Sequence, residues 1–160
     1  MTEPPLVLES SASEPQTDPV ATKRKFTLHW VLWLRVSNQR AGNKVLGWFS
    51  EALGREVTVT VNERYWKDPS LRRVMATSPV HAQEIAEAVF EVLRVCGHVA
   101  YGWNVSGPIW STDGWNFQGD AGWRPNARIK VVGLDCVEFE LSEYGLPTGP
   151  EANTLDTPSS

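Results

Sequence analysis

The stretch from Ser78 to Gln118, SPVHAQEIAEAVFEVLRVCGHVAYGWNVSGPIWSTDGWNFQ, decides the fold of this 160-residue chain. Its first half has the pattern of an amphipathic helix, because apolar residues recur at steps of three or four, at Ile85, Val89, Val92 and Cys96. Ser78-Pro79 is a typical helix start, and Gly97 is a typical stop. The sequence therefore predicts a helix between these two signals.

The segment after the helix predicts strands and a hairpin. Residues 99–105 alternate between large apolar and small or polar side chains, as in a strand, and Gly107-Pro108 is expected to end it. Residues 109–112 and 115–118 flank Asp113-Gly114, which favours a tight hairpin turn. Residues 119–126 are expected to form an exposed loop. Residues 127–141 alternate again, as one bent strand or as a hairpin with a corner at Gly133.

The first half of the chain predicts a strand, a helix and a strand. Residues 25–36 alternate and are apolar on both faces at their centre, which indicates a central strand. Asn38 and Gly54 are the expected caps of a helix over 39–53, with a core-facing stripe at Ala41, Val45, Trp48, Phe49 and Ala52. Residues 56–61 alternate valine with threonine. Together they predict a βαβ unit, followed by a long loop over 62–77.

These elements predict an α+β two-layer sandwich. We expect the βαβ unit, the long loop, the second helix and an antiparallel meander, with the helices on one face of a mixed sheet. Residues 1–23 and 147–160 are rich in Pro, Ser and Thr and poor in apolar residues, which predicts disordered tails. Residues 24–146 then form a single domain.

The charge distribution, the hydrophobic runs and the cysteines indicate the type of partner and the cellular compartment. The net charge is −4, but the bases concentrate between residues 35 and 73 and the acids between 113 and 143, which hints at an oppositely charged partner. The longest apolar run, Trp30 to Leu34, is too short for a membrane span, and the first residues lack the pattern of a signal peptide. We expect a cytoplasmic protein in which Cys96 and Cys136 are small buried hydrophobes.

Sequence motifs for chemistry are few. No glycine-rich nucleotide loop and no nucleophile elbow occurs, and we expect no cofactor. Only Cys96-Gly-His98 has a spacing that suggests metal ligands. Because no second pair of Cys or His ligands accompanies it, we expect no metal. The weakest hypothesis is an enzyme. It would use Cys96 as a nucleophile with His98 as its base, or a groove beside Tyr101 and Trp103, but the sequence offers no acid–base pair at a convincing spacing. We expect no catalytic residues.

Three of the eight tryptophans lie in turn-rich segments. Aromatic residues at a polar rim are common anchors of protein interfaces. We therefore hypothesise a surface that recognises a protein partner, formed by Trp110, Asp113, Trp115, Asp120 and Trp123. The alternative is that the tryptophans cap an open end of the sandwich.

The predicted loop 62–77 carries a second candidate surface. Basic residues lie there beside aromatic ones, at Arg64, Tyr65, Trp66, Lys67, Arg72 and Arg73. This pattern is typical of sites for single-stranded nucleic acid or phosphate. It is equally typical of a solvated loop or of a surface for an acidic protein.

The leading functional hypothesis is a small non-enzymatic protein-binding module. In size, fold class, tryptophan content and acidic balance the chain resembles, in general type only, bacterial immunity or antitoxin proteins. That resemblance implies steric occlusion of a toxin or enzyme with a basic face. Binding of nucleic acid or phosphate through 63–73 is the alternative, and a small enzyme ranks last.

Overall fold

The computed structural model describes residue 2, residues 25–112 and residues 114–143. The tails predicted over 1–23 and 147–160 lie outside this range, apart from Thr2, as does Asp113 of the predicted surface. The elements in chain order are β1 (Phe26–Arg35), α1 (Gln39–Leu53), β2 (Thr58–Arg64), β3 (Leu71–Val80), α2 (Ile85–Val99), β4 (Ala100–Tyr101), β5 (Asn104–Ser111), β6 (Gly114–Ala121), β7 (Arg128–Ile129) and β8 (Leu134–Glu143).

Six of the strands form one sheet in the order β2-β3-β1-β8-β6-β5, while β4 and β7 pair separately. Every pair of neighbouring strands is antiparallel. β1 and β2 run parallel to each other, but β3 lies between them, so the two strands of the βαβ unit are not neighbours. The order β2-β3-β1-β8, with α1 and α2 as the crossovers, is a ferredoxin-like topology that the β5–β6 hairpin extends by two strands.

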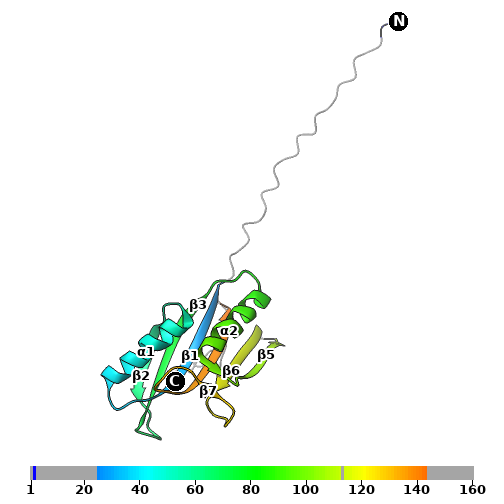
Figure 1. Ribbon diagram of the computed structural model, residues 1–160. Helices are drawn as coiled ribbons and strands as arrows, with labels where there is room; N and C mark the ends of the chain where they lie inside the picture. The colour runs from blue at the N-terminus through cyan, green and yellow to red at the C-terminus, as the bar shows by residue number, and fades with distance from the viewer. Residues whose placement is uncertain (1, 3–24, 113, 144–160) are drawn as a thin grey trace, which may run out of the picture.

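The predicted α+β two-layer arrangement is confirmed. α1 and α2 lie side by side on one face of the sheet (Figure 1) and contact each other. Alternate residues of β1 point into this layer and are fully buried, with Trp30 packing edge-on against Phe49 of α1 at 5.2 Å between ring centroids. Neither described helix is long and apolar enough to cross a membrane.

α1 confirms the predicted helix and both of its caps. Asn38 accepts a hydrogen bond from the backbone N–H of Ala41 at 2.9 Å, and Gly54 adopts the left-handed conformation with φ 66°. The predicted core stripe is wrong at one position, because Trp48 is 39% exposed and its ring lies beside Lys44.

α2 lies where a helix is predicted, but both predicted end signals are wrong. Ser78-Pro79 belongs to β3, and the helix begins after Glu84. The carboxylate of Glu87 accepts there from the backbone N–H of Glu84 at 3.4 Å and from that of Gln83 at 2.9 Å. Gly97 lies within the helix, which continues to Val99. The strand predicted over 99–105 is therefore reduced to β4 and the start of β5.

The long loop predicted over 62–77 is also wrong, because most of it forms the hairpin of β2 and β3. β2 is an edge strand whose residues are exposed or half-buried, contrary to the inward-facing valines that the sequence predicts. In β3 the buried positions include Ala76 and Ser78, which are small because the bulky Trp30 lies next to them on β1. Small inward residues hide the alternation that marks a strand.

The tryptophan-rich segment forms the predicted hairpin, with Trp110 of β5 opposite Trp115 of β6. Gly107-Pro108 does not end a strand but lies within β5, at a shift of register between Ser106 and Ile109. The loop predicted over 119–126 starts later, since β6 continues to Ala121. Residues 127–141 are neither one strand nor one hairpin, because β7 pairs with β4 whereas β8 lies between β1 and β6.

Candidate functional site on the uncovered face of the sheet

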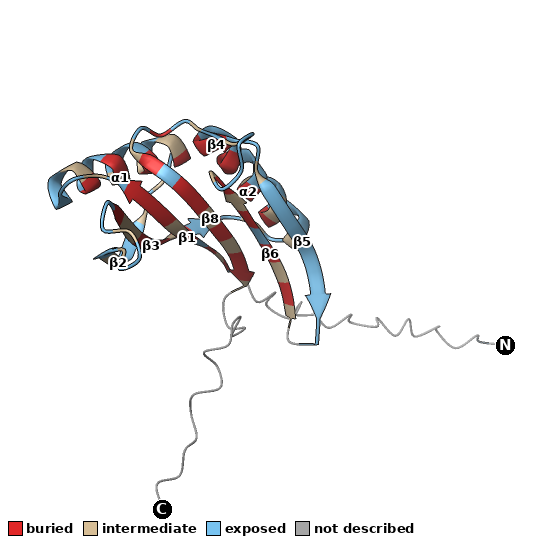
Figure 2. Ribbon diagram, turned by 90° about the horizontal axis from the view of Figure 1, so that it is seen from below, coloured by how far each residue is buried: buried red, intermediate tan, exposed pale blue. Residues whose placement is uncertain are grey.

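Both helices pack on one face of the six-stranded sheet, and in the part of the chain that the structure describes no helix covers the second face (Figure 2). Because side chains alternate along a strand, the residues between the core positions point to this side. We call it the open face and define it by residues at matching register positions, namely Met75, Thr77, His29, Val31, Trp33, Glu138, Glu140, Gln118, Asp120, Asn104 and Ser106.

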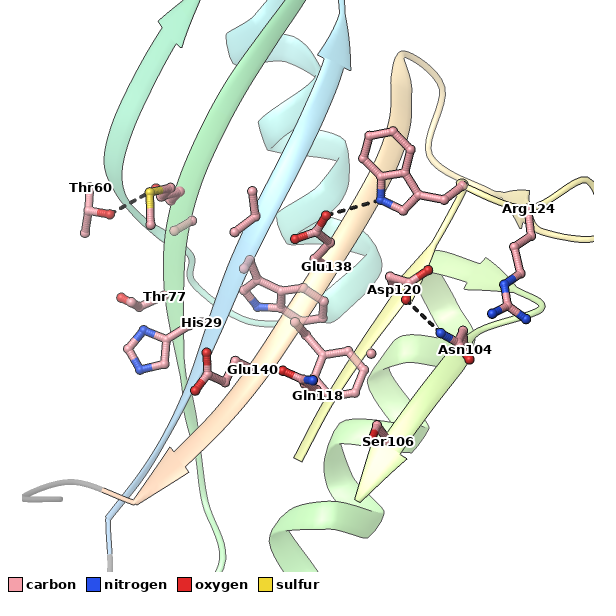
Figure 3. Close-up of a pocket in the computed structure, with 17 residues that line it drawn as sticks. His29, Thr60, Thr77, Asn104, Ser106, Gln118, Asp120, Arg124, Glu138 and Glu140 are labelled. Carbon is pink, nitrogen blue, oxygen red and sulfur yellow. Dashed lines mark hydrogen bonds between the residues drawn. The ribbon is translucent and has the colours of Figure 1, made fainter. Parts of the chain in front are cut away.

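Most of the open face lines a single groove of about 760 Å³. Figure 3 shows its polar side chains, which come from all six strands of the sheet and from the segment after β6. Three carboxylates lie in it, those of Asp120, Glu138 and Glu140. The part of the groove on β1, β2 and β3 is lined by the apolar Val31 and Met75 together with the polar His29, Thr60 and Thr77. The groove is therefore acidic on one side and mixed apolar and polar on the other.

Asp120 and Glu138 lie directly opposite each other on β6 and β8. Asp120 accepts a hydrogen bond from the amide of Asn104 at 3.0 Å, and Glu138 accepts one from the indole N–H of Trp123 at 3.2 Å. Both donors are neutral, and within residues 25–112 and 114–143 neither carboxylate forms an ion pair. Like charges at directly opposite positions destabilise a sheet, so this pair is an electrostatic cost in the isolated protein.

The next row across the open face carries Glu140 between His29 and Gln118. Glu140 accepts from the amide of Asn116 at 3.4 Å. The Nε2 atom of His29 lies 2.9 Å from the hydroxyl of Ser142. Within the described residues, Glu140 forms no ion pair.

Aromatic side chains form one rim of the groove. Trp33 is 8% exposed and packs between Tyr65, at 4.6 Å between ring centroids, and Trp123, at 6.0 Å. Trp123 itself is 57% exposed. The rim thus presents one accessible indole on a rigid aromatic support, next to the carboxylate of Glu138.

The two cysteines are free and buried. Cys136 lies opposite Trp33 on the same side of the sheet as the open face, and it donates to the carbonyl of Ala121 at 3.1 Å. Burial, together with the charge of Glu138, raises the pKa of the Cys136 thiol to about 12. Burial also raises the pKa of the Cys96 thiol. Both thiols are protonated at neutral pH, which makes them poor nucleophiles.

The described part of the chain contains no group of three or more His, Cys, Asp or Glu residues that could hold a metal ion. The arrangement on the open face is instead that of a negatively charged binding groove. No family model, curated protein or solved structure matches this chain. Its functional assignment therefore depends on the site geometry.

The structure divides the predicted protein-binding surface. Asp120 and Trp123 meet on the open face. Trp115 is only 5% exposed, packs on Phe26 at 6.0 Å and lies at the other end of β6 on the helix-covered side. Trp110 is 66% exposed and stacks beside Trp115, away from the groove. Of the four predicted residues that the structure describes, the groove therefore brings together two.

The predicted anionic-ligand site lies in and beside the turn between β2 and β3. Arg73 forms an ion pair with Glu63 at 2.9 Å, and Arg72 donates to Asn62 at 3.0 Å, so these two side chains are already engaged. Lys67 lies over the ring of Trp66, which is 80% exposed. Arg64 ends β2, and Tyr65 packs on Trp33. A role of this turn in binding stays a prediction.

Sequence reasoning missed most of the groove, namely His29, Asn104, Gln118, Glu138 and Glu140. A local signal existed, since polar residues alternate with apolar ones along β8. That signal identifies an exposed face but not which strands share it. The adjacency of β8 and β6 depends on long-range pairing, which a single sequence does not display.

Proposed function

We propose that this protein is a non-enzymatic protein-binding module that holds a basic surface of its partner on the open face. The observation that carries this proposal is the direct opposition of Asp120 and Glu138 in a groove, where neither carboxylate forms an ion pair within the described residues. A positively charged partner would relieve this repulsion. Binding would then gain both from the new contacts and from the removal of an existing cost.

The mixed lining of the groove favours a protein as the partner. Val31 is half-buried and Met75 is 37% exposed, so apolar contact area adjoins the carboxylates. Interfaces between proteins combine such an apolar centre with a polar rim, and exposed aromatic residues such as Trp123 are common anchors.

Nucleic acid is a poor match for the same face. Sheets that bind single-stranded RNA stack bases on aromatic side chains and neutralise phosphates with basic ones. Here three carboxylates line the groove, and they would repel a phosphate backbone. A nucleic-acid site would have to use the turn between β2 and β3 instead.

An inhibitor of the immunity or antitoxin type is the specific form of module that we propose. Such a protein acts by covering the active face of a toxin or enzyme. Enzymes that act on nucleic acids carry basic active faces, and an acidic sheet face would be steered to them electrostatically. The compact domain and its uncovered sheet support this proposal.

The test is affinity capture with matched charge-reversal variants. We would purify the tagged full-length chain from its own cell, with nuclease treatment, and identify the retained proteins by mass spectrometry. We expect a stoichiometric partner that Glu138→Lys/Glu140→Lys loses and that Glu51→Lys/Glu56→Lys keeps, since Glu51 and Glu56 are exposed away from the open face.

Circular dichroism and thermal unfolding of both variants would show that they are folded. An identical set of retained proteins for wild type and the open-face variant would contradict the proposal. Retention of nucleic acid that vanishes at higher salt would direct attention to Arg64 through Arg73.

A further inference from the structure

We propose that the groove of the open face receives an arginine side chain of the partner, with its guanidinium between Asp120 and Glu138 and against the ring of Trp123. This inference rests on the proposed function, because it names the residue by which the partner would engage the face. It identifies the partner segment as basic, with an apolar residue next to the arginine.

The first argument is charge complementarity across one row of the sheet. The row runs from Met75 through Val31 to Glu138, Asp120 and Asn104 on successive strands. Directly opposite residues have Cβ atoms about 4.5–5.5 Å apart, so one cation can contact both carboxylates. Arg124 also lines the groove, yet it forms no ion pair with either carboxylate in the described part of the chain.

The second argument is the direction of the hydrogen bonds already made. Trp123 donates to Oε1 of Glu138, and Asn104 donates to Oδ1 of Asp120. A carboxylate has about four acceptor positions, so the second oxygen of each group can accept from an incoming donor. A guanidinium carries five N–H donors in a planar fork and can bridge two carboxylates, whereas an ammonium is a single point charge.

The third argument is the aromatic rim. Trp123 is 57% exposed and lies beside Glu138, while the buried Trp33 supports its ring. A guanidinium stacks on aromatic faces and gains cation–π attraction as well as contact area. The support of Trp33 holds the indole in place before binding, which lowers the conformational entropy lost on binding.

The fourth argument is the apolar half of the row. Val31 and Met75 adjoin the carboxylates on β1 and β3. They offer contact area to the aliphatic part of the arginine or to the residue next to it. The open face is therefore a surface for a peptide segment rather than a group of acidic residues alone.

The test uses blocked tripeptides with leucine, a central residue and glycine. The central residue is arginine, uncharged citrulline or lysine, and binding is followed by NMR on the isotope-labelled full chain. The indole N–H resonance of Trp123, assigned with Trp123→Phe, reports on the groove. We expect a saturable shift with the arginine peptide and affinity at least about tenfold weaker with citrulline, which loses a charge-assisted contact.

Variants locate the site within the groove. Asp120→Asn and Glu138→Gln should each weaken the arginine peptide by about tenfold, since each keeps an acceptor oxygen but removes the charge. Glu56→Gln, on an exposed position outside the groove, should leave the affinity unchanged. Amide spectra of the free variants would show that each one is folded.

Several outcomes would overturn the inference: no shift with the arginine peptide, equal affinity for citrulline, or unchanged affinity in both variants. Equal affinity for the lysine and arginine peptides would show that the groove is a general cation site and not one specific for a guanidinium. The proposed function fails separately. If the charge-reversal variant loses the partner while arginine does not bind, protein binding stands and the arginine site falls. If the arginine peptide binds but wild type and the charge-reversal variant retain the same proteins, the groove binds arginine and the proposed protein-binding function falls.

Discussion

Trp30 of β1 donates its indole N–H to the hydroxyl of Ser78 on β3 at 3.0 Å, and both side chains are 1% exposed. This bond satisfies the one polar atom of a large core residue. Ser78→Ala leaves the N–H buried without a partner, and we expect the free energy of unfolding to fall by about 1–3 kcal/mol. Urea denaturation would measure it. Ser106→Ala, at an exposed serine, is the control and should change little.

The opposition of Asp120 and Glu138 predicts a variant that is more stable than the natural chain. Glu138→Gln removes one charge and keeps the acceptor for the indole of Trp123. We expect the free energy of unfolding to rise by about 0.2–1 kcal/mol at low salt. Because salt screens the repulsion, the gain should shrink at high salt. Lower stability at every salt concentration would contradict the assigned repulsion.

Glu91 of α2 predicts an acid-dependent loss of stability. A hydrogen bond from Arg94, together with Arg55, lowers the pKa of Glu91 from 4.5 to about 2. Because the folded-state pKa is the lower one, the stabilisation is complete above pH 4.5 and is lost as the pH falls toward 2. Glu91→Gln should cost about 1 kcal/mol at neutral pH, since solvent screens the half-exposed Arg94.

Unfolding of the wild type and Glu91→Gln would be measured across this pH range. The difference in stability between them should shrink as the pH falls toward 2. A difference that is independent of pH would show that the effect of the substitution is not electrostatic.

Gly119 lies under the open face and tolerates no side chain. A Cβ atom there would meet the ring of the core residue Phe139 at 2.6 Å and the carbonyl of Asn104 at 3.0 Å. Gly119→Ala should therefore lower the free energy of unfolding by about 1–3 kcal/mol. Gly47 of α1 is the matched control, since nothing lies within 4 Å of its Cβ position. Gly47→Ala should raise stability by about 0.5–1 kcal/mol through helix propensity.

The parts of the fold that local signals determine could be predicted from the sequence. α1 has the predicted bounds because Asn38 and Gly54 satisfy its first N–H and last carbonyl groups by themselves. β3 could not be predicted, because Ala76 and Ser78 are small only in response to Trp30 on another strand. Ser78-Pro79 consequently has the pattern of a helix cap although it ends a strand.

The candidate site could be predicted only in part, for a related reason. Asp120 and Trp123 stand out in the sequence because turn-forming residues surround them. Glu138 contributes equally to the groove, yet its position opposite Asp120 is set by the register of β8 against β6. The same register places Trp115 in the core, which its turn-rich surroundings do not indicate.

The central position of β8 has a consequence for synthesis of the protein. His29 and Ser142 contact each other across β1 and β8 although 113 residues separate them in sequence. While a ribosome makes the chain, β1 and β6 each lack this neighbour, and their edges are open to mispairing. Glu138 and Glu140 of the groove lie on β8. A nascent chain that ends before β8 would therefore lack the carboxylates that face Asp120 and Gln118 across the sheet.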